Sequence, residues 1–129
     1  MNTVGQINLI AAWIGILLGF LSGMVLGLFF HRENWLGGYG SFKRRLYRLA
    51  HISFFGLAAA NFFFHLTLAA VPFTRALNLA STGFLIGAVA MPVCCLLMAH
   101  FPKTRMLFAV PVISLTAGAV LTTLEVIKL

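Results

Sequence analysis

The sequence predicts an all-α membrane protein, an antiparallel bundle of four transmembrane helices with both termini on the non-cytoplasmic side. Of the 129 residues, 61% are hydrophobic and 9% are charged, whereas about a quarter of a soluble domain is charged. The apolar residues form four runs of about 20 or more, enough to cross a hydrocarbon core of about 30 Å. Because these runs fill the chain, we expect one transmembrane domain over residues 1–129.

The first helix is expected over residues 7–30, which carry no charge. Residues 1–8 lack the basic stretch of a signal peptide, so we expect this helix to be retained. Small residues recur at every fourth position along one stripe, at Gly15, Gly19, Gly23 and Gly27. Such a stripe allows another backbone, or a flat ligand, to approach closely. We interpret it as a helix-packing face, a glycine zipper.

The longest connection, residues 31–41, contains Trp35, Tyr39 and three glycines. We expect a flexible interfacial loop with aromatic anchors. Ser41 then provides an N-cap for the second helix.

The second helix is expected over residues 42–71, and Pro72 ends it. Its first turns are basic, which is the wrong sign for a helix N-terminus. We therefore expect these side chains to set the topology and to bind anionic lipid headgroups, at about 1 kcal/mol each. They are Lys43, Arg44, Arg45 and Arg48.

The third helix is expected over residues 76–99, with a local kink at Pro92. Its adjacent Cys94 and Cys95 are too close in sequence for an ordinary disulfide, so we interpret them as packing residues.

The fourth helix is expected over residues 106–127, with a weaker disturbance at Pro111, near its start. One stripe of this helix should face protein because steps of three, four and seven residues return to the same side. It consists of Pro111, Ser114, Gly118, Thr122 and Glu125.

The orientation follows from the basic residues, since Lys and Arg in short loops stay cytoplasmic. Seven of them flank the first and third connections: Arg32, Lys43, Arg44, Arg45, Arg48, Lys103 and Arg105. Only Arg75 and Lys128 lie on the other side. We expect an N-out, C-out protein of a bacterial inner membrane. The net charge of +7 is thus a topology signal, and no nucleic-acid partner is expected.

Histidines are the strongest metal-ligating groups in so apolar a chain. His51 and His65 are 14 residues apart, which places them within about 40° on one helix face and roughly 21 Å apart along the axis. This spacing resembles the ligand helices of the two-haem cytochrome b family, in which histidines 14 apart hold one haem b near each membrane surface. The resemblance covers these two residues and implies haem b ligation by them. The second ligand helix of that family has no counterpart here.

Several partners for these histidines remain open. His31 and His100 lie at the cytoplasmic ends of their helices, where either could complete an axial pair with His51. For His65 three alternatives stay open: a partner histidine from a second copy of the chain, a five-coordinate site, or no outer haem. Alternatively, His51 and His65 donate hydrogen bonds to backbone carbonyls or to hydroxyls such as those of Ser53, Thr67 and Ser81. A third interpretation places zinc or copper between His31, His51 and His100, with Cys94 or Cys95.

Two further polar residues are candidates for coupling a proton or cation to transport. Glu125 is the acid nearest the core, although it can also pair with Arg75 at the outer surface. Asn61 is expected to make an interhelical hydrogen bond in preference to binding a substrate.

Three functions remain open. The first is a small, non-catalytic accessory subunit of a larger membrane complex, such as a respiratory one, associated with other membrane subunits or with copies of itself. The second is a b-type haem electron-transfer unit using His51 and His65, and the third is a small oligomeric transporter or channel using Asn61, His65 and Glu125. Independent enzymatic activity is not expected, because the chain has two acids and no nucleophile elbow or phosphate-binding glycine loop.

Overall fold

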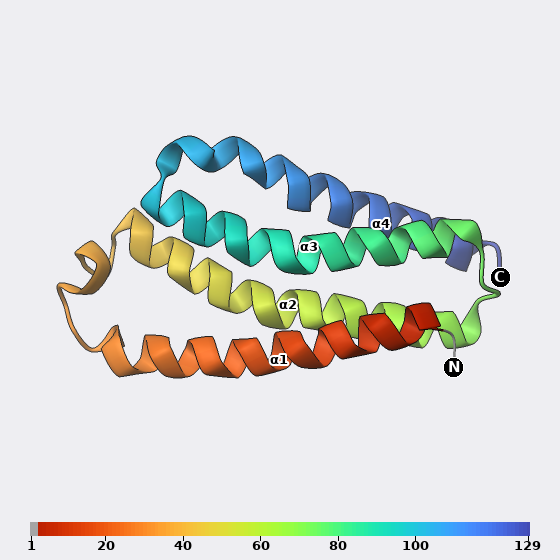
Figure 1. Ribbon diagram of the computed structural model, residues 1–129, viewed down its shortest axis with the longest axis horizontal. Coiled ribbons are helices and arrows are strands. Elements are labelled where there is room, and N and C mark those ends of the chain that lie inside the picture. The colour runs from red at the N-terminus through yellow and green to blue at the C-terminus, as the bar shows by residue number, and fades with distance from the viewer. Residues whose placement is uncertain (1–2) are drawn as a thin grey trace.

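The computed structural model describes residues 3–129, and within them the chain is helical with no strand. Four long helices lie side by side along the longest axis (Figure 1). By length and composition, each is able to cross a membrane. They are α1 (Thr3–Phe30), α2 (Phe42–Ala70), α3 (Arg75–His100) and α4 (Ala109–Ile127), with short 3-10 helices at η1 (Trp35–Gly37) and η2 (Pro102–Phe108).

The helix ends differ from the expected ones by more than one residue at two places. α1 begins at Thr3, one turn before the expected start at residue 7. The fourth helix does not begin at residue 106, because Pro102 opens the 3-10 segment η2 and regular α-helix starts only at Ala109. Pro111 therefore lies in the first turn of α4, where backbone N–H groups lack intrahelical partners in any case. α3 continues through Pro92.

Hydroxyl side chains start two of the helices. The Ser41 hydroxyl accepts a hydrogen bond from the Arg44 N–H at 3.1 Å, which confirms the predicted N-cap of α2. Thr74 does the same for α3, accepting from the Leu77 N–H at 3.3 Å. Both caps satisfy one of the donors that a helix N-terminus leaves free.

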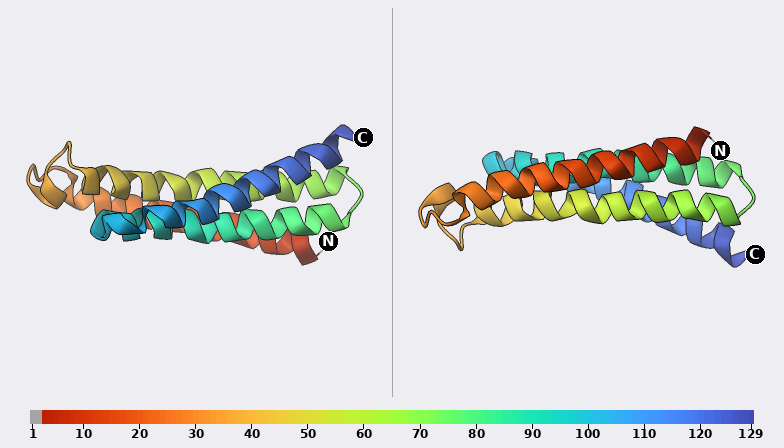
Figure 2. Two further views of the ribbon diagram at one scale, coloured as in Figure 1. Left: turned by 90° about the horizontal axis from the view of Figure 1, so that it is seen from above. Right: turned by 90° about the horizontal axis from the view of Figure 1, so that it is seen from below.

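The helices are arranged in a row. α1 packs on α2, α2 on α3, and α3 on α4, with a lighter contact between α1 and α3. In Figure 1, α1 and α4 lie at opposite edges, and both termini lie at the same end. Figure 2 shows α4 running obliquely across the other helices. The two edge helices consequently leave most of their apolar surface exposed.

An apolar core joins α2 and α3. Phe64 and Phe84 are its centre, with ring centroids 5.3 Å apart, and Leu77 and Ala80 beside them are fully buried. This core holds the central pair of helices together at the end where the termini lie.

Small residues set the contact between α3 and α4. A Cβ atom at Gly83 would lie 2.5 Å from the Ser114 carbonyl oxygen, and one at Gly118 would lie 3.1 Å from the Ala80 carbonyl oxygen. The two backbones therefore approach more closely than any larger side chain permits.

Candidate functional site

A buried polar cluster connects α1, α2 and α3. Asn8 donates through Nδ2 to Asn61 Oδ1 at 2.8 Å, and the Ser81 hydroxyl donates to Asn8 Oδ1 at 2.5 Å. Asn61 also donates to the Leu57 carbonyl at 2.9 Å. All three side chains are almost inaccessible. The predicted interhelical hydrogen bond of Asn61 is confirmed, whereas the sequence did not identify Asn8 as its partner.

His65 attaches α2 to the start of α1. Its Nδ1 lies 2.8 Å from the Gly5 carbonyl oxygen. A carbonyl only accepts, so Nδ1 carries the proton, and in the neutral ring the lone pair is on Nε2. The ring is half-buried between the two helices.

His51 makes a similar attachment at the other end of α1. Its Nδ1 lies 2.9 Å from the Ser22 hydroxyl, whose oxygen also lies 3.1 Å from the Gly19 carbonyl oxygen. The hydroxyl has one proton and these two acceptors within reach, so it bonds to either tautomer of the His51 ring. Both histidines contact α1, on the shared face that the 14-residue spacing predicted.

The kind of hydrogen bond expected for the two histidines is confirmed, because His65 bonds to a backbone carbonyl and His51 to a hydroxyl. The three hydroxyls named from the sequence are not the partners. The Ser53 and Thr67 hydroxyls bond back to their own helix, to the Ala50 and Phe63 carbonyls. Ser81 donates to Asn8 instead. A serine or threonine within a helix readily bonds to a carbonyl three or four residues earlier, so its hydroxyl is already engaged.

The glycine stripe of α1 contacts α2 over part of its length. A Cβ atom at Gly15 would lie 3.0 Å from Ala58 Cβ, one at Gly19 would lie 2.6 Å from the Phe55 ring, and one at Gly23 would lie 2.9 Å from His51 Cε1. Gly27 is exposed and has nothing within 4 Å of that position. The close approach of the glycine stripe therefore ends at Gly23, about two turns before α1 ends at Phe30.

The remaining histidines do not join His51. His100 Nε2 bonds to the Tyr47 hydroxyl at 2.7 Å, and the His31 residue is exposed. Within residues 3–129, no three His, Cys, Asp or Glu side chains come close enough to share a metal ion, so the suggested zinc or copper set is not brought together. Cys94 and Cys95 are both buried free thiols.

Glu125 pairs within its own helix. Its carboxylate lies 2.5 Å from Lys128 Nζ, one turn later, and the Glu125 side chain is buried. The expected partner Arg75 is wrong, because the i,i+3 spacing brings the lysine onto the same face. This ion pair lies at the end of the bundle where the C-terminus emerges (Figure 1).

Arg44 does not lie at the surface, although the sequence predicts a surface position for it. We expected it to bind lipid headgroups, but its side chain is only 1% exposed. The guanidinium carbon lies 4.1 Å from the Tyr39 ring centroid, 4.7 Å from that of Phe30 and 5.5 Å from that of Trp35. This is an aromatic cage held by cation–π attraction.

Backbone carbonyls complete the cage. Arg44 donates to the carbonyl oxygens of Phe30 and Arg32, while its Nε has no hydrogen-bond partner in the part of the chain that the structure describes. The connection folds over the guanidinium through a positive φ at Leu36, followed by Gly37 and Gly38. The expected flexible loop is instead a folded turn around a buried cation.

An apolar groove of about 440 Å³ opens between α1, α2 and α3. Its walls include Ala11, Gly15, Ala58, Ala88, Pro92 and Leu96. None of the four histidines lines it. Small side chains on three helices thus leave a slot that faces the surroundings of the bundle.

Comparison of the chain with protein families, with curated proteins and with solved structures finds no match. Functional conclusions therefore rest on the geometry of these residues: a polar cluster and two histidines that connect helices, a caged arginine, and an apolar groove.

Proposed function

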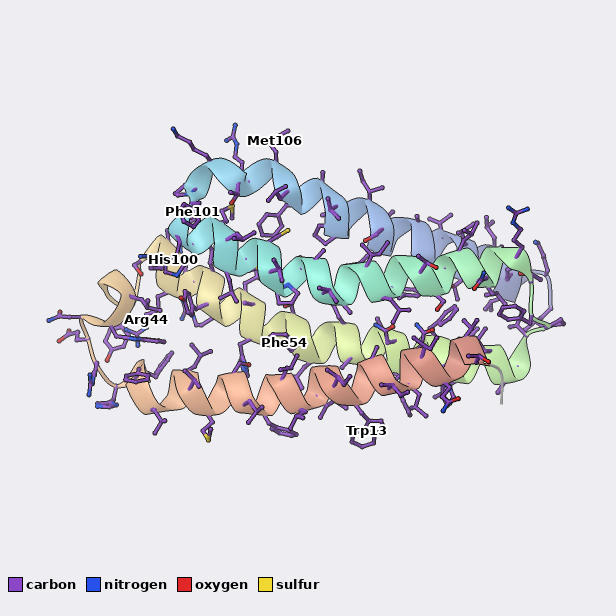
Figure 3. All side chains as sticks on the ribbon, in the orientation of Figure 1. Trp13, Arg44, Phe54, His100, Phe101 and Met106 are labelled. Atoms are coloured by element: carbon purple, nitrogen blue, oxygen red, sulfur yellow. The ribbon has the colours of Figure 1, made fainter. Side chains whose placement is uncertain are left out.

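We propose that the protein is a small, non-catalytic integral membrane subunit that packs laterally against a helix of another subunit or of a second copy. The observation that carries this proposal is Trp13. Its side chain is 63% exposed and points away from the bundle (Figure 3). It lies near the middle of α1.

Tryptophan in membrane proteins is enriched at the interface, where its indole N–H reaches water or headgroups. At mid-membrane depth, lipid offers that N–H no acceptor, and an unsatisfied polar group in hydrocarbon is costly. Phe20 and Met24 follow on the same helix face at steps of seven and four residues, and they are 67% and 59% exposed. Aromatic residues and methionine are typical of protein interfaces. A partner helix over this ridge would cover all three and accept the indole hydrogen bond.

The polar groups inside the bundle support the non-catalytic part of the proposal. Asn61, His51 and His65 are each used to hold α2 against α1, and Glu125 pairs with Lys128. The transporter hypothesis gains no support from groups engaged in this way.

Photo-crosslinking in native membranes tests the proposal. With benzoylphenylalanine at position 20, we expect one protein adduct of defined mass, and twice the chain mass would identify a second copy. The matched control is the same probe at Ile113 on α4, which is equally exposed at 67%. Trp13→Ala should reduce the adduct. Lipid adducts alone from position 20 would refute the proposal.

We further propose an antiparallel, N-out and C-out arrangement in a bacterial inner membrane. Contacts between α1 and α2 support the antiparallel part, because positions rise on one helix as they fall on the other: Gly5 with His65, Asn8 with Asn61, Ser22 with His51. Gly40→Cys, at a position with open space around it, and Leu129→Cys should label from opposite sides of the membrane in a background without Cys94 and Cys95. Labelling of both from one side would contradict the topology.

One observation favours haem b binding as a second candidate function. His65 uses Nδ1–H as a donor to the Gly5 carbonyl, which leaves its Nε2 as the ligating atom. Because α1 fills the Nδ1 side of the His65 ring, a porphyrin would have to lie on the Nε2 side of that ring. Protein purified under haem-replete conditions should then show a Soret band and, after dithionite, an α band that His51→Ala and His65→Ala each alter. A colourless preparation would rule this function out.

A further inference from the structure

We infer that the groove between α1, α2 and α3 binds an acyl chain of an anionic phospholipid, whose phosphate is held by Lys43, Tyr47 and His100. This inference is independent of the proposed lateral partner. The ridge of Trp13, Phe20 and Met24 and the groove lie on different faces of α1 and share no residue.

The dimensions of the groove fit one acyl chain. Along α3 it extends from Leu85 to Leu96, about 16 Å at 1.5 Å per residue, which is close to half of a hydrocarbon core of about 30 Å. Its volume of about 440 Å³ is typical of a small-molecule site. The length and volume of the slot therefore suit one linear hydrocarbon chain.

A hydrogen-bonded pair lies beyond the groove residues, toward the basic loops. Tyr47 precedes the groove residue Phe54 by two helical turns, and His100 follows the groove residue Leu96 by one turn, so both are on the groove side of their helices. Their hydrogen bond of 2.7 Å joins α2 to α3 there. His100 lies at the loop end of the bundle in Figure 3.

Charge at this end favours an anionic headgroup. Lys43 lies one turn before Tyr47 on the same face of α2. Six further basic residues belong to the first and third connections or their flanks, against the single acid Glu33. A phosphate at this level would accept hydrogen bonds from the Lys43 ammonium and from the Tyr47–His100 pair, which keeps one proton free after its own hydrogen bond. The headgroup sits at the surface while its chain runs inward along the groove.

Native mass spectrometry of the full chain with matched lipids tests the inference. The protein is mixed with phosphatidylglycerol and phosphatidylcholine that carry identical acyl chains. We expect one retained phosphatidylglycerol, favoured at least tenfold over phosphatidylcholine. Ala88→Phe and, on another helix, Ala11→Phe should each reduce lipid retention at least tenfold by filling the groove. The matched control is Ala117→Phe on the exposed surface of α4, which should retain lipid as the unaltered chain does.

The headgroup contact is tested separately. Lys43→Gln should weaken phosphatidylglycerol retention about threefold or more and leave phosphatidylcholine unchanged, whereas Lys103→Gln, an exposed lysine at the same end, should have no effect. Because Lys43→Gln leaves the groove itself unchanged, it tests the inference even where a groove variant fails to fold. Equal retention of both lipids with no effect of Lys43→Gln would overturn the inference. Retention of lipid by both folded groove variants would overturn it as well, as would a bound protein segment in the groove.

Discussion

The two outer helices are held to their neighbours by different means. α1 is attached to α2 by side-chain hydrogen bonds at three levels, through Gly5 with His65, Asn8 with Asn61 and Ser22 with His51. At the α3–α4 interface, the hydroxyls of Ser114 and Thr122 bond back to α4 itself. There, glycines bring the two backbones together.

The two interfaces show two ways of holding one helix against another in a membrane. Lipid is as apolar as a leucine side chain, so helices in a membrane are held together by close van der Waals packing or by polar bonds. A polar bond depends on one atom pair and tolerates nearby volume changes. Close backbone packing depends on the absence of a side chain, so it is sensitive to added volume along its whole length.

The largest effect is expected from Gly83→Leu. A Cβ atom there would lie 2.5 Å from the Ser114 carbonyl oxygen, and backbone cannot move aside as a flexible side chain can. We expect a loss of about 3 kcal/mol in the free energy of unfolding, measured by helical circular dichroism during titration with SDS. Gly56→Leu is the matched control, since nothing lies within 4 Å of that position. Equal stability of the two variants would show that close packing does not hold α4.

A smaller loss is expected from Asn61→Leu, which leaves Asn8 without its buried amide partner. Interhelical hydrogen bonds in membranes contribute about 0.6 kcal/mol on average, and buried unsatisfied groups cost about 1–3 kcal/mol. We therefore expect a loss of about 1–2 kcal/mol in the same titration. A double-mutant cycle with Asn8→Leu should reveal coupling between the two sites. Strict additivity would mean that the amides do not stabilise each other.

The smallest effect is expected from Gly23→Ala, because its new methyl group meets the end of the His51 ring and not backbone. The ring can rotate, so the loss should stay below about 1 kcal/mol. The measurement is the NMR spectrum of the His51 imidazole, whose signals should shift as its hydrogen bond to Ser22 is broken. Gly27→Ala, on the same stripe but with open space, should leave those signals in place. Identical spectra for both variants would contradict the described packing.

The spans were predictable because hydropathy and length alone decide them, and the N-cap Ser41 followed from local chemistry. The hydrogen-bond partners could not be predicted in this way, because they depend on the rotation and relative depth of two helices. The sequence predicts the right kind of hydrogen bond for Asn61. It does not identify Asn8, at the edge of the first apolar run, as the partner. A second amide in an apolar run was the one available signal.

Arg44 was placed wrongly for a related reason. Charge patterning treats the basic residues near the first connection as equivalent, but the cage depends on the path of the connection, with positive φ at Leu36 and the two following glycines. Its aromatic walls, Trp35 and Tyr39, were noted as interfacial anchors. Their closure over one particular guanidinium is a tertiary property that residue spacing does not encode.

The row arrangement of the helices also bears on how the chain is made. The strong contacts join helices that are consecutive in sequence, so each new helix finds its neighbour already in the bilayer as synthesis proceeds. Such local connectivity favours rapid assembly, since little loop-closure entropy is lost. The bond between Asn8 and Ser81 is different, because it spans 73 residues. We expect it to form only when α3 has been inserted, as the step that fastens α3 to α1.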